Sequence, residues 1–200
     1  MTPIIGIVGG IGSGKSVVAD AMQALGGHLI VADRLGHDAL LDPDIKTRLV
    51  ARWGNAILDD AGNIDRKKVG AIVFADQAEL RALESQVFPY IEKNIAEEIA
   101  RARTRTGVQF IILDAAILLE TGWHRHCDKV LYVDAPRDLR LARVRDKRGW
   151  TEAELDRREK MQMPLEEKKA RADVVIVNDE DFEKVRRQVE DTLVRWKVIC

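Results

Sequence analysis

The chain has 200 residues, 46% of them hydrophobic and 32% charged, which is typical of a globular domain and not of a disordered segment. A formal net charge of −1 provides no global basic field for nucleic acid, and no apolar run approaches the roughly 18–20 residues that span a bilayer. The two cysteines, Cys127 and Cys200, lack metal-ligand spacing, so we expect reduced thiols in a cytoplasmic protein without nucleic-acid or membrane partners.

Short apolar runs along the chain predict buried strands, which alternate with helical segments. The predicted strands are Pro3–Val8, His28–Asp33, Val108–Ala116, Asp128–Ala135 and Asp173–Asp179. A first helix is predicted over Ser16–Leu25, mostly helical structure from Arg34 to about Arg105, and a last amphipathic helix to about Lys197. Strands that alternate with helices over this length predict an α/β fold with a parallel sheet.

The stretch Gly9–Ser16, GGIGSGKS, fits the phosphate-loop pattern G-x-x-x-x-G-K-[ST] and lies between a predicted strand and a predicted helix. Its glycines allow backbone N–H groups to converge on an anion, and the following helix directs its positive end at the same anion. We expect Lys15 to bridge the β- and γ-phosphates of ATP and Ser16 to ligate Mg²⁺. The predicted ATP-binding residues of this loop are Gly10, Ile11, Gly12, Ser13, Gly14, Lys15, Ser16 and Val17. The pattern predicts the three-layer sandwich of P-loop NTPases, but it names no reaction.

A small P-loop kinase also needs an acid beside the acceptor hydroxyl. Asp33 ends the second predicted strand, where ligands gather in open α/β sheets, and its carboxylate could take the proton of the acceptor. The alternative is that Asp33 caps the helix that begins near Arg34. Asp114 ends the apolar run FIILD and could hold the water shell of Mg²⁺, or it could be an ordinary turn residue.

A basic segment lies between the last two predicted core strands. Residues 137–171 are too long for a simple crossover, so we expect a helical excursion that acts as a lid. Its arginines could neutralise the transferring phosphoryl group, although a solvated helix face is the commoner arrangement. Within it we select Arg143 for catalysis and Arg148 for ATP binding. Arg158 and Gln162, one helical turn apart, could share a face toward the nucleotide.

Several further stretches occur in the order found in one family. These are GGIGSGKS, ADRLGHD, WGNAILDDAGNIDRKKVGAIVFAD, AILLETG and RREKMQMPLEEKKARADVVIVND. Together they resemble the motifs of the dephospho-coenzyme A kinase family over nearly the whole chain. The resemblance implies that MgATP phosphorylates the 3′-hydroxyl of the ribose of dephospho-coenzyme A.

The resemblance also implies an architecture and a set of acceptor-binding residues. It divides the chain into a core of residues 1–33, 107–136 and 172–200, a helical acceptor-side segment of 34–106 and a lid of 137–171. Asp33 becomes the acid at the acceptor hydroxyl. The implied acceptor-binding residues are Asp33, His37, Phe88, Glu120, Arg158 and Gln162. Four positions depart from the family pattern, namely Val31, His37, Phe88 and Ala116, and Phe88 cannot donate the hydrogen bond of the family histidine.

Two alternatives remain open at the level of sequence. One is a nucleoside or nucleotide kinase of the same architecture, which would prefer a bare nucleotide as acceptor. The other is a non-catalytic ATP-binding regulatory domain, against which the intact Lys15, Ser16 and Asp33 argue. The sequence makes no prediction of the oligomeric state.

Overall fold

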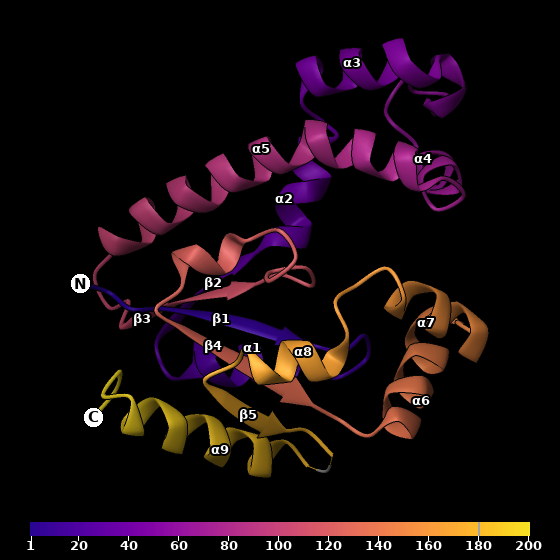
Figure 1. The fold of residues 1–200 in the computed structure, drawn as a ribbon. Helices are drawn as coiled ribbons and strands as arrows, with labels where there is room; N and C mark the ends of the chain where they lie inside the picture. The colour runs from indigo at the N-terminus through magenta and orange to yellow at the C-terminus, as the bar shows by residue number, and fades with distance from the viewer. Residues whose placement is uncertain (180) are drawn as a thin grey trace. The chain divides into compact units, whose positions relative to one another are not determined.

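A computed structural model describes residues 1–179 and 181–200. Its strands form one all-parallel sheet in the order β2-β3-β1-β4-β5 (Figure 1). The strands are β1 (Ile4–Gly9), β2 (Gly27–Val31), β3 (Phe110–Asp114), β4 (Lys129–Asp134) and β5 (Val174–Val177). The predicted α/β class with a parallel sheet is therefore confirmed.

Helices fill the connections between these strands. They are α1 (Lys15–Ala24), α2 (Ala32–Ala39), α3 (Pro43–Trp53), α4 (Arg66–Val73), α5 (Gln77–Arg103), α6 (Arg137–Arg148), α7 (Glu152–Glu159), α8 (Leu165–Ala170) and α9 (Phe182–Arg195), with 3₁₀ turns η1 (Asn55–Ile57) and η2 (Trp123–His126). None of the described helices combines the length and the apolar character that crossing a bilayer requires.

Strand β1 lies in the centre of the sheet and is buried along its whole length. Its run of apolar residues suits a parallel strand that is covered on both faces. Gly6 is needed for this cover, because a Cβ atom there would come within 2.5 Å of Leu118 and 2.9 Å of the Cys127 sulfur. The phosphate loop begins where this rigid strand ends.

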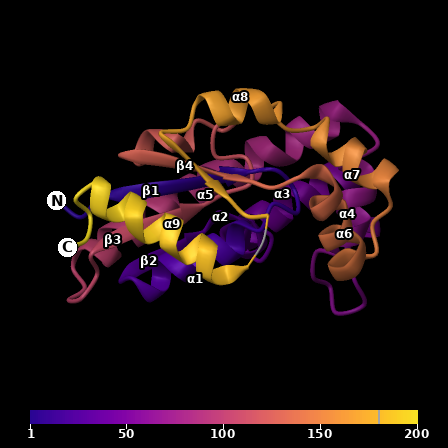
Figure 2. The ribbon, with the colours of Figure 1, turned by 90° about the horizontal axis from the view of Figure 1, so that it is seen from below.

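Helices cover both faces of the sheet, which gives three layers (Figure 2). Helices α1 and α9 pack on one face, where Ile5 and Ile7 of β1 join Val18 and Val189 in one buried cluster. Helix α8 and the segment between β3 and β4 cover the other face. The two sides together fix the end of β1, from which the loop departs.

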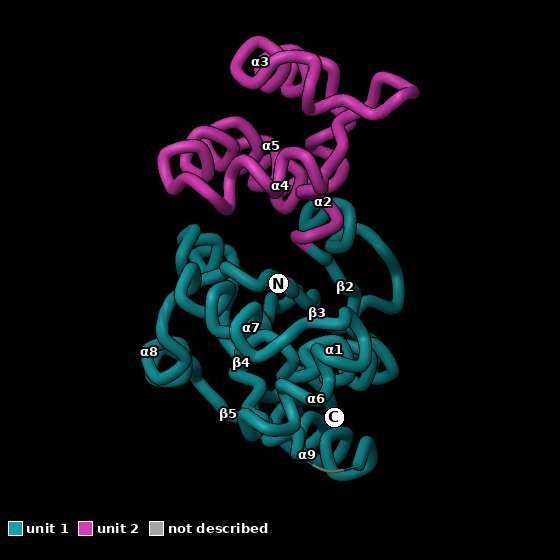
Figure 3. Tube along the Cα trace, turned by 90° about the vertical axis from the view of Figure 1, so that its right-hand side faces the viewer, with its two compact units in different colours: residues 1–31, 98–200 teal, residues 32–97 magenta. Residues whose placement is uncertain are grey.

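The chain divides into two compact units, which Figure 3 colours separately. Unit 1 contains residues 1–31 and 98–200, and unit 2 contains residues 32–97. Residues 137–171 belong to unit 1, where they form α6, α7 and α8. The predicted strand through Asp33 is wrong at its end, because β2 stops at Val31 and Ala32 begins α2.

Candidate active site

The phosphate loop connects β1 to α1 and depends on two glycines with left-handed backbones. Gly12 has φ +78° and Gly14 has φ +85°. A Cβ atom at Gly12 would come within 2.6 Å of the Arg140 carbonyl oxygen, and one at Gly14 within 2.1 Å of Asn178 Nδ2. Helix α1 begins directly after the loop at Lys15, so the positive end of the helix faces the loop. The local geometry is that of an anion site.

Lys15 and Ser16 stand at the start of α1, as the sequence pattern predicts. Lys15 Nζ lies 3.3 Å from the carbonyl oxygen of Gly9 and 3.5 Å from that of Gly10, so the ammonium stays beside the loop. The Ser16 residue is exposed. Asp114 ends β3 and pairs in register with Ile7 of the neighbouring β1.

The oxygen donors at this site suit magnesium. The Ser16 hydroxyl and the Asp114 carboxylate provide hard oxygen ligands of the kind that Mg²⁺ takes alongside substrate phosphates and water. In the part of the chain that the structure describes, no cluster of three or more His, Cys, Asp or Glu side chains could hold a metal by itself. The Ser16 and Asp114 oxygens suit Mg²⁺, whose other ligands would come from nucleotide phosphates and water.

Arg143 on α6 reaches the phosphate loop from behind. Its Nη1 donates to the carbonyl oxygens of Gly12 at 3.4 Å and Ser13 at 3.2 Å, and its Nη2 donates to the carbonyl oxygen of Asn178 at 3.1 Å. Arg140, one turn earlier, donates to the Ile11 carbonyl oxygen at 3.4 Å and pairs with Glu159 of α7. The basic segment thus contacts the loop backbone through two arginines.

The other predicted arginines of this segment surround one aromatic ring. The guanidinium carbons of Arg148 and Arg158 lie 4.7 Å and 4.3 Å from the centroid of the Trp150 ring. Arg158 also pairs with Glu154, at 2.6 Å. The expectation that Arg158 and Gln162 share a helix face is wrong, because α7 ends at Glu159 before Gln162 is reached.

Lys168 is a residue that the sequence analysis missed. Its side chain has no exposed surface, and its Nζ pairs with Glu120 Oε1 at 2.8 Å. The same ammonium donates to Gln162 Oε1 at 3.1 Å and to the Ala116 carbonyl oxygen at 2.9 Å. Two predicted acceptor residues, Glu120 and Gln162, are thereby brought together. Lys168 lies in the stretch RREKMQMPLEEKKARADVVIVND that resembles the family motif, but nothing in that stretch separates it from the neighbouring Lys169.

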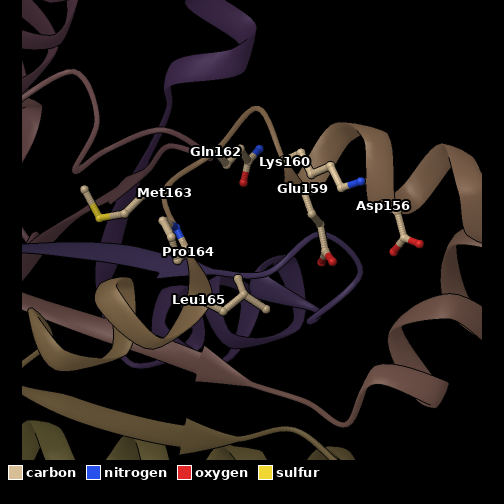
Figure 4. A pocket seen from close by; sticks show the side chains of 7 residues that line it. All are labelled: Asp156, Glu159, Lys160, Gln162, Met163, Pro164 and Leu165. Carbon is tan, nitrogen blue, oxygen red and sulfur yellow. The ribbon is translucent and has the colours of Figure 1, made fainter.

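A cavity of about 350 Å³ opens beside the turn between α7 and α8 (Figure 4). It is lined by Asp156, Glu159, Lys160, Gln162, Met163, Pro164 and Leu165. Leu165 connects this cavity to the phosphate loop, because a Cβ atom at Gly10 would meet its methyl groups at 3.3 Å. Met163 donates its backbone N–H to Glu120 at 2.9 Å. The cavity therefore adjoins the Lys168 cluster, which we define as Lys168, Glu120, Gln162 and the Ala116 carbonyl oxygen.

Three further predicted residues lie in unit 2. Asp33 and His37 are exposed on α2, in its first and last turns. Phe88 is half-buried on α5, next to Pro89 inside that helix. The phosphate loop, Arg143 and the Lys168 cluster all lie in unit 1.

Comparison with known proteins identifies the family. The family model described as dephospho-CoA kinase matches residues 3–184. A dephospho-CoA kinase from Geobacillus kaustophilus is 40% identical, over 100% of this chain and 99% of its own length. The chain belongs to the dephospho-CoA kinase family. A dephospho-CoA kinase from Carboxydothermus hydrogenoformans is 38% identical, over 98% of this chain and 95% of its own length.

Solved structures share the fold of this chain. A crystal structure of a Thermus thermophilus protein superposes with a TM-score of 0.83 at 32% identity and covers 97% of both chains. A dephospho-CoA kinase from Campylobacter jejuni, at 23% identity, shares the fold with a TM-score of 0.71 over 98% of both chains. The three-layer P-loop sandwich predicted from the sequence is therefore confirmed, while the roles of single residues stay predictions.

Proposed function

We propose that this protein is a dephospho-CoA kinase, which transfers the γ-phosphoryl group of ATP to the 3′-hydroxyl of dephospho-coenzyme A and releases ADP. The observation that carries the proposal is the family membership, matched over residues 3–184, together with a phosphate loop whose backbone geometry suits a nucleotide. A cytoplasmic location, where MgATP is available and the free thiols stay reduced, forms part of the proposal.

In this mechanism the loop and the start of α1 bind the phosphates through backbone N–H groups, and Lys15 binds the β- and γ-phosphates. Ser16 and, through water, Asp114 would hold Mg²⁺, which would neutralise charge on the phosphate oxygens. Arg143 is the basic-segment residue that we assign to the developing charge of the transferring group. In this structure its guanidinium binds carbonyl oxygens at the back of the loop, so this role requires it to move to the front.

Asp33 is the proposed acid of the acceptor side. Its carboxylate orients the ribose hydroxyl and accepts the proton of that hydroxyl as the oxygen bonds to the γ-phosphorus. The bond from phosphorus to the β–γ bridging oxygen breaks, and ADP leaves. We assign the binding of the acceptor to His37, Phe88, Glu120, Arg158 and Gln162. Phe88 can bind the acceptor only by apolar contact.

The test is ADP release from MgATP with dephospho-coenzyme A as acceptor, with mass detection of the product. A mass gain of one phosphate on dephospho-coenzyme A supports the proposal. Phosphorylation of a bare nucleoside or nucleotide in its place would indicate a related kinase. Tight ATP binding without any phosphorylated acceptor would indicate a regulatory domain.

A further inference from the structure

Asn178 follows β5 and presents a buried side chain to the back of the phosphate loop. The residue is 3% exposed. Its Nδ2 donates to the carbonyl oxygen of Ser13 at 2.7 Å, and its backbone N–H donates to the carbonyl oxygen of Asp134 at 2.8 Å. Asn178 is therefore tied to the end of β4 on one side and to the loop on the other.

Arg143 fixes the position of Asn178. Its Nη2 donates to the backbone oxygen of Asn178 at 3.1 Å and to the side-chain Oδ1 at 3.4 Å. Because Oδ1 accepts from the guanidinium, the amide must direct its Nδ2 donor at the loop. The donor and acceptor ends of this amide therefore have different partners, and its orientation is determined.

The contact determines the direction of a loop N–H group. In a trans peptide the C=O and the following N–H point in opposite directions. Asn178 and Arg143 both bind the Ser13 carbonyl oxygen at the back of the loop, so the Gly14 N–H is directed to the front. The same argument applies to the Ile11 carbonyl oxygen, which Arg140 binds. N–H groups aligned in this way form the anion-binding concavity of a phosphate loop.

The fit between Asn178 and Gly14 is close. A Cβ atom at Gly14 would lie 2.1 Å from Asn178 Nδ2, so the side-chain amide occupies the space that a side chain at position 14 would need. The glycine of the sequence pattern thus serves two purposes here. It permits φ +85°, and it admits the amide that holds the loop.

We propose that Asn178 is a positioning residue that holds the phosphate loop in its nucleotide-binding conformation before the nucleotide arrives. A loop held in this way does not have to be ordered on binding, and the affinity for MgATP rises accordingly. The proposal rests on nucleotide binding by the loop, and it does not depend on which acceptor the enzyme uses.

The experiment is a calorimetric titration of Asn178→Ala with a non-hydrolysable ATP analogue and Mg²⁺, in the absence of any acceptor. We expect about tenfold weaker binding, the scale of one lost hydrogen bond together with the looser loop. Asn178→Asp keeps the shape but places a carboxylate against the Ser13 carbonyl oxygen, and it should weaken binding at least as much. The Asn178→Asp variant tests the proposal if Asn178→Ala does not fold.

The matched control is Asn94→Ala, because Asn94 Nδ2 also donates to a backbone oxygen, that of Tyr90 at 2.9 Å, but within unit 2. This variant should bind the analogue like the wild type. In steady-state assays, Asn178→Ala should raise the KM for ATP and leave the KM for the acceptor unchanged at saturating ATP. Wild-type affinity in folded Asn178→Ala and Asn178→Asp, or an equal loss in Asn94→Ala, would overturn the proposal. Because the titration contains no acceptor, failure of the dephospho-CoA assignment would leave its result intact.

Discussion

The ammonium of Lys168 lies 2.8 Å from the carboxylate of Glu120, and the lysine side chain has no exposed surface. Its three N–H groups match three acceptors, those of Glu120, Gln162 and the Ala116 backbone. Helix α8 is therefore fixed to the segment that follows β3 and to the turn that lines the cavity. A buried charge held in this way is costly to leave without a partner.

Replacement of Lys168 by methionine should lower the free energy of unfolding by about 2–3 kcal/mol, because Glu120, Gln162 and the Ala116 carbonyl oxygen lose the buried ammonium that they share. Urea denaturation measures this change. The control is Lys169→Met, the neighbouring lysine, which is 41% exposed where it pairs with Asp134. That variant should stay within about 1 kcal/mol of the wild type. Equal losses in both variants would contradict the special role of the buried ammonium.

Asp33→Asn should reduce kcat by at least about 10²-fold while MgATP affinity stays unchanged, because the amide cannot accept the proton of the acceptor hydroxyl. Turnover assays and a nucleotide titration measure the two effects separately. Asp38→Asn, at an exposed position of the same helix, provides the control and should turn over normally. A normal kcat in Asp33→Asn would mean that Asp33 only stabilises the first turn of α2.

The stability of unit 2 should depend on pH through Glu79. Hydrogen bonds from Arg52 and Trp53 hold the pKa of the Glu79 carboxyl below its ordinary value of 4.5. A lowered pKa in the folded state adds stability that is present above pH 4.5 and is lost as the pH falls through the folded value. Thermal unfolding should therefore show Glu79→Gln less stable than the wild type at pH 6–8.

The difference in thermal stability between Glu79→Gln and the wild type should narrow as the pH falls below about 4.5. Glu97→Gln is the control, because Glu97 lies 3.9 Å from Lys93 on an exposed helix surface. That variant should follow the wild-type curve throughout. A gap between Glu79→Gln and the wild type that stays constant into acid would refute the linkage.

The two thiols should react at very different rates. Burial, with a smaller contribution from Asp128, raises the pKa of the Cys127 thiol to about 12, so almost none of it is thiolate at pH 8. Cys200 is exposed. A thiol reagent such as Ellman's reagent should therefore modify Cys200 quickly and should modify Cys127 only after the protein unfolds. In Cys200→Ser the fast phase should disappear, and rapid reaction of that variant would contradict the assignment.

The sheet could be predicted from the sequence because each strand is a short apolar run bounded by turn residues. The error at β2 has a local cause, since the alanine at position 32 does not mark the change from strand to helix. The error at Gln162 arose because the spacing suits a helix, whereas α7 ends at Glu159.

The contacts of the candidate site were harder to predict. The pattern predicts Lys15 and Ser16 as site residues because the phosphate loop is a continuous stretch of chain. Lys168 and Asn178 act through partners far away in sequence, at Glu120 and Ser13. Lys168 and Lys169 look alike in the sequence, and only the packing of α8 against the sheet decides which of them is buried.

The central position of β1 also sets the order in which this protein can fold. Ile4 pairs with Ile111 and Ile5 with Lys129, so both neighbours of β1 are synthesised long after it. At ribosomal speeds of about 5–20 residues per second, the apolar strand waits roughly 5–20 s for its first partner. During that interval both of its edges can pair with other chains. The strand that positions the phosphate loop is thus the one that waits longest for a partner during synthesis.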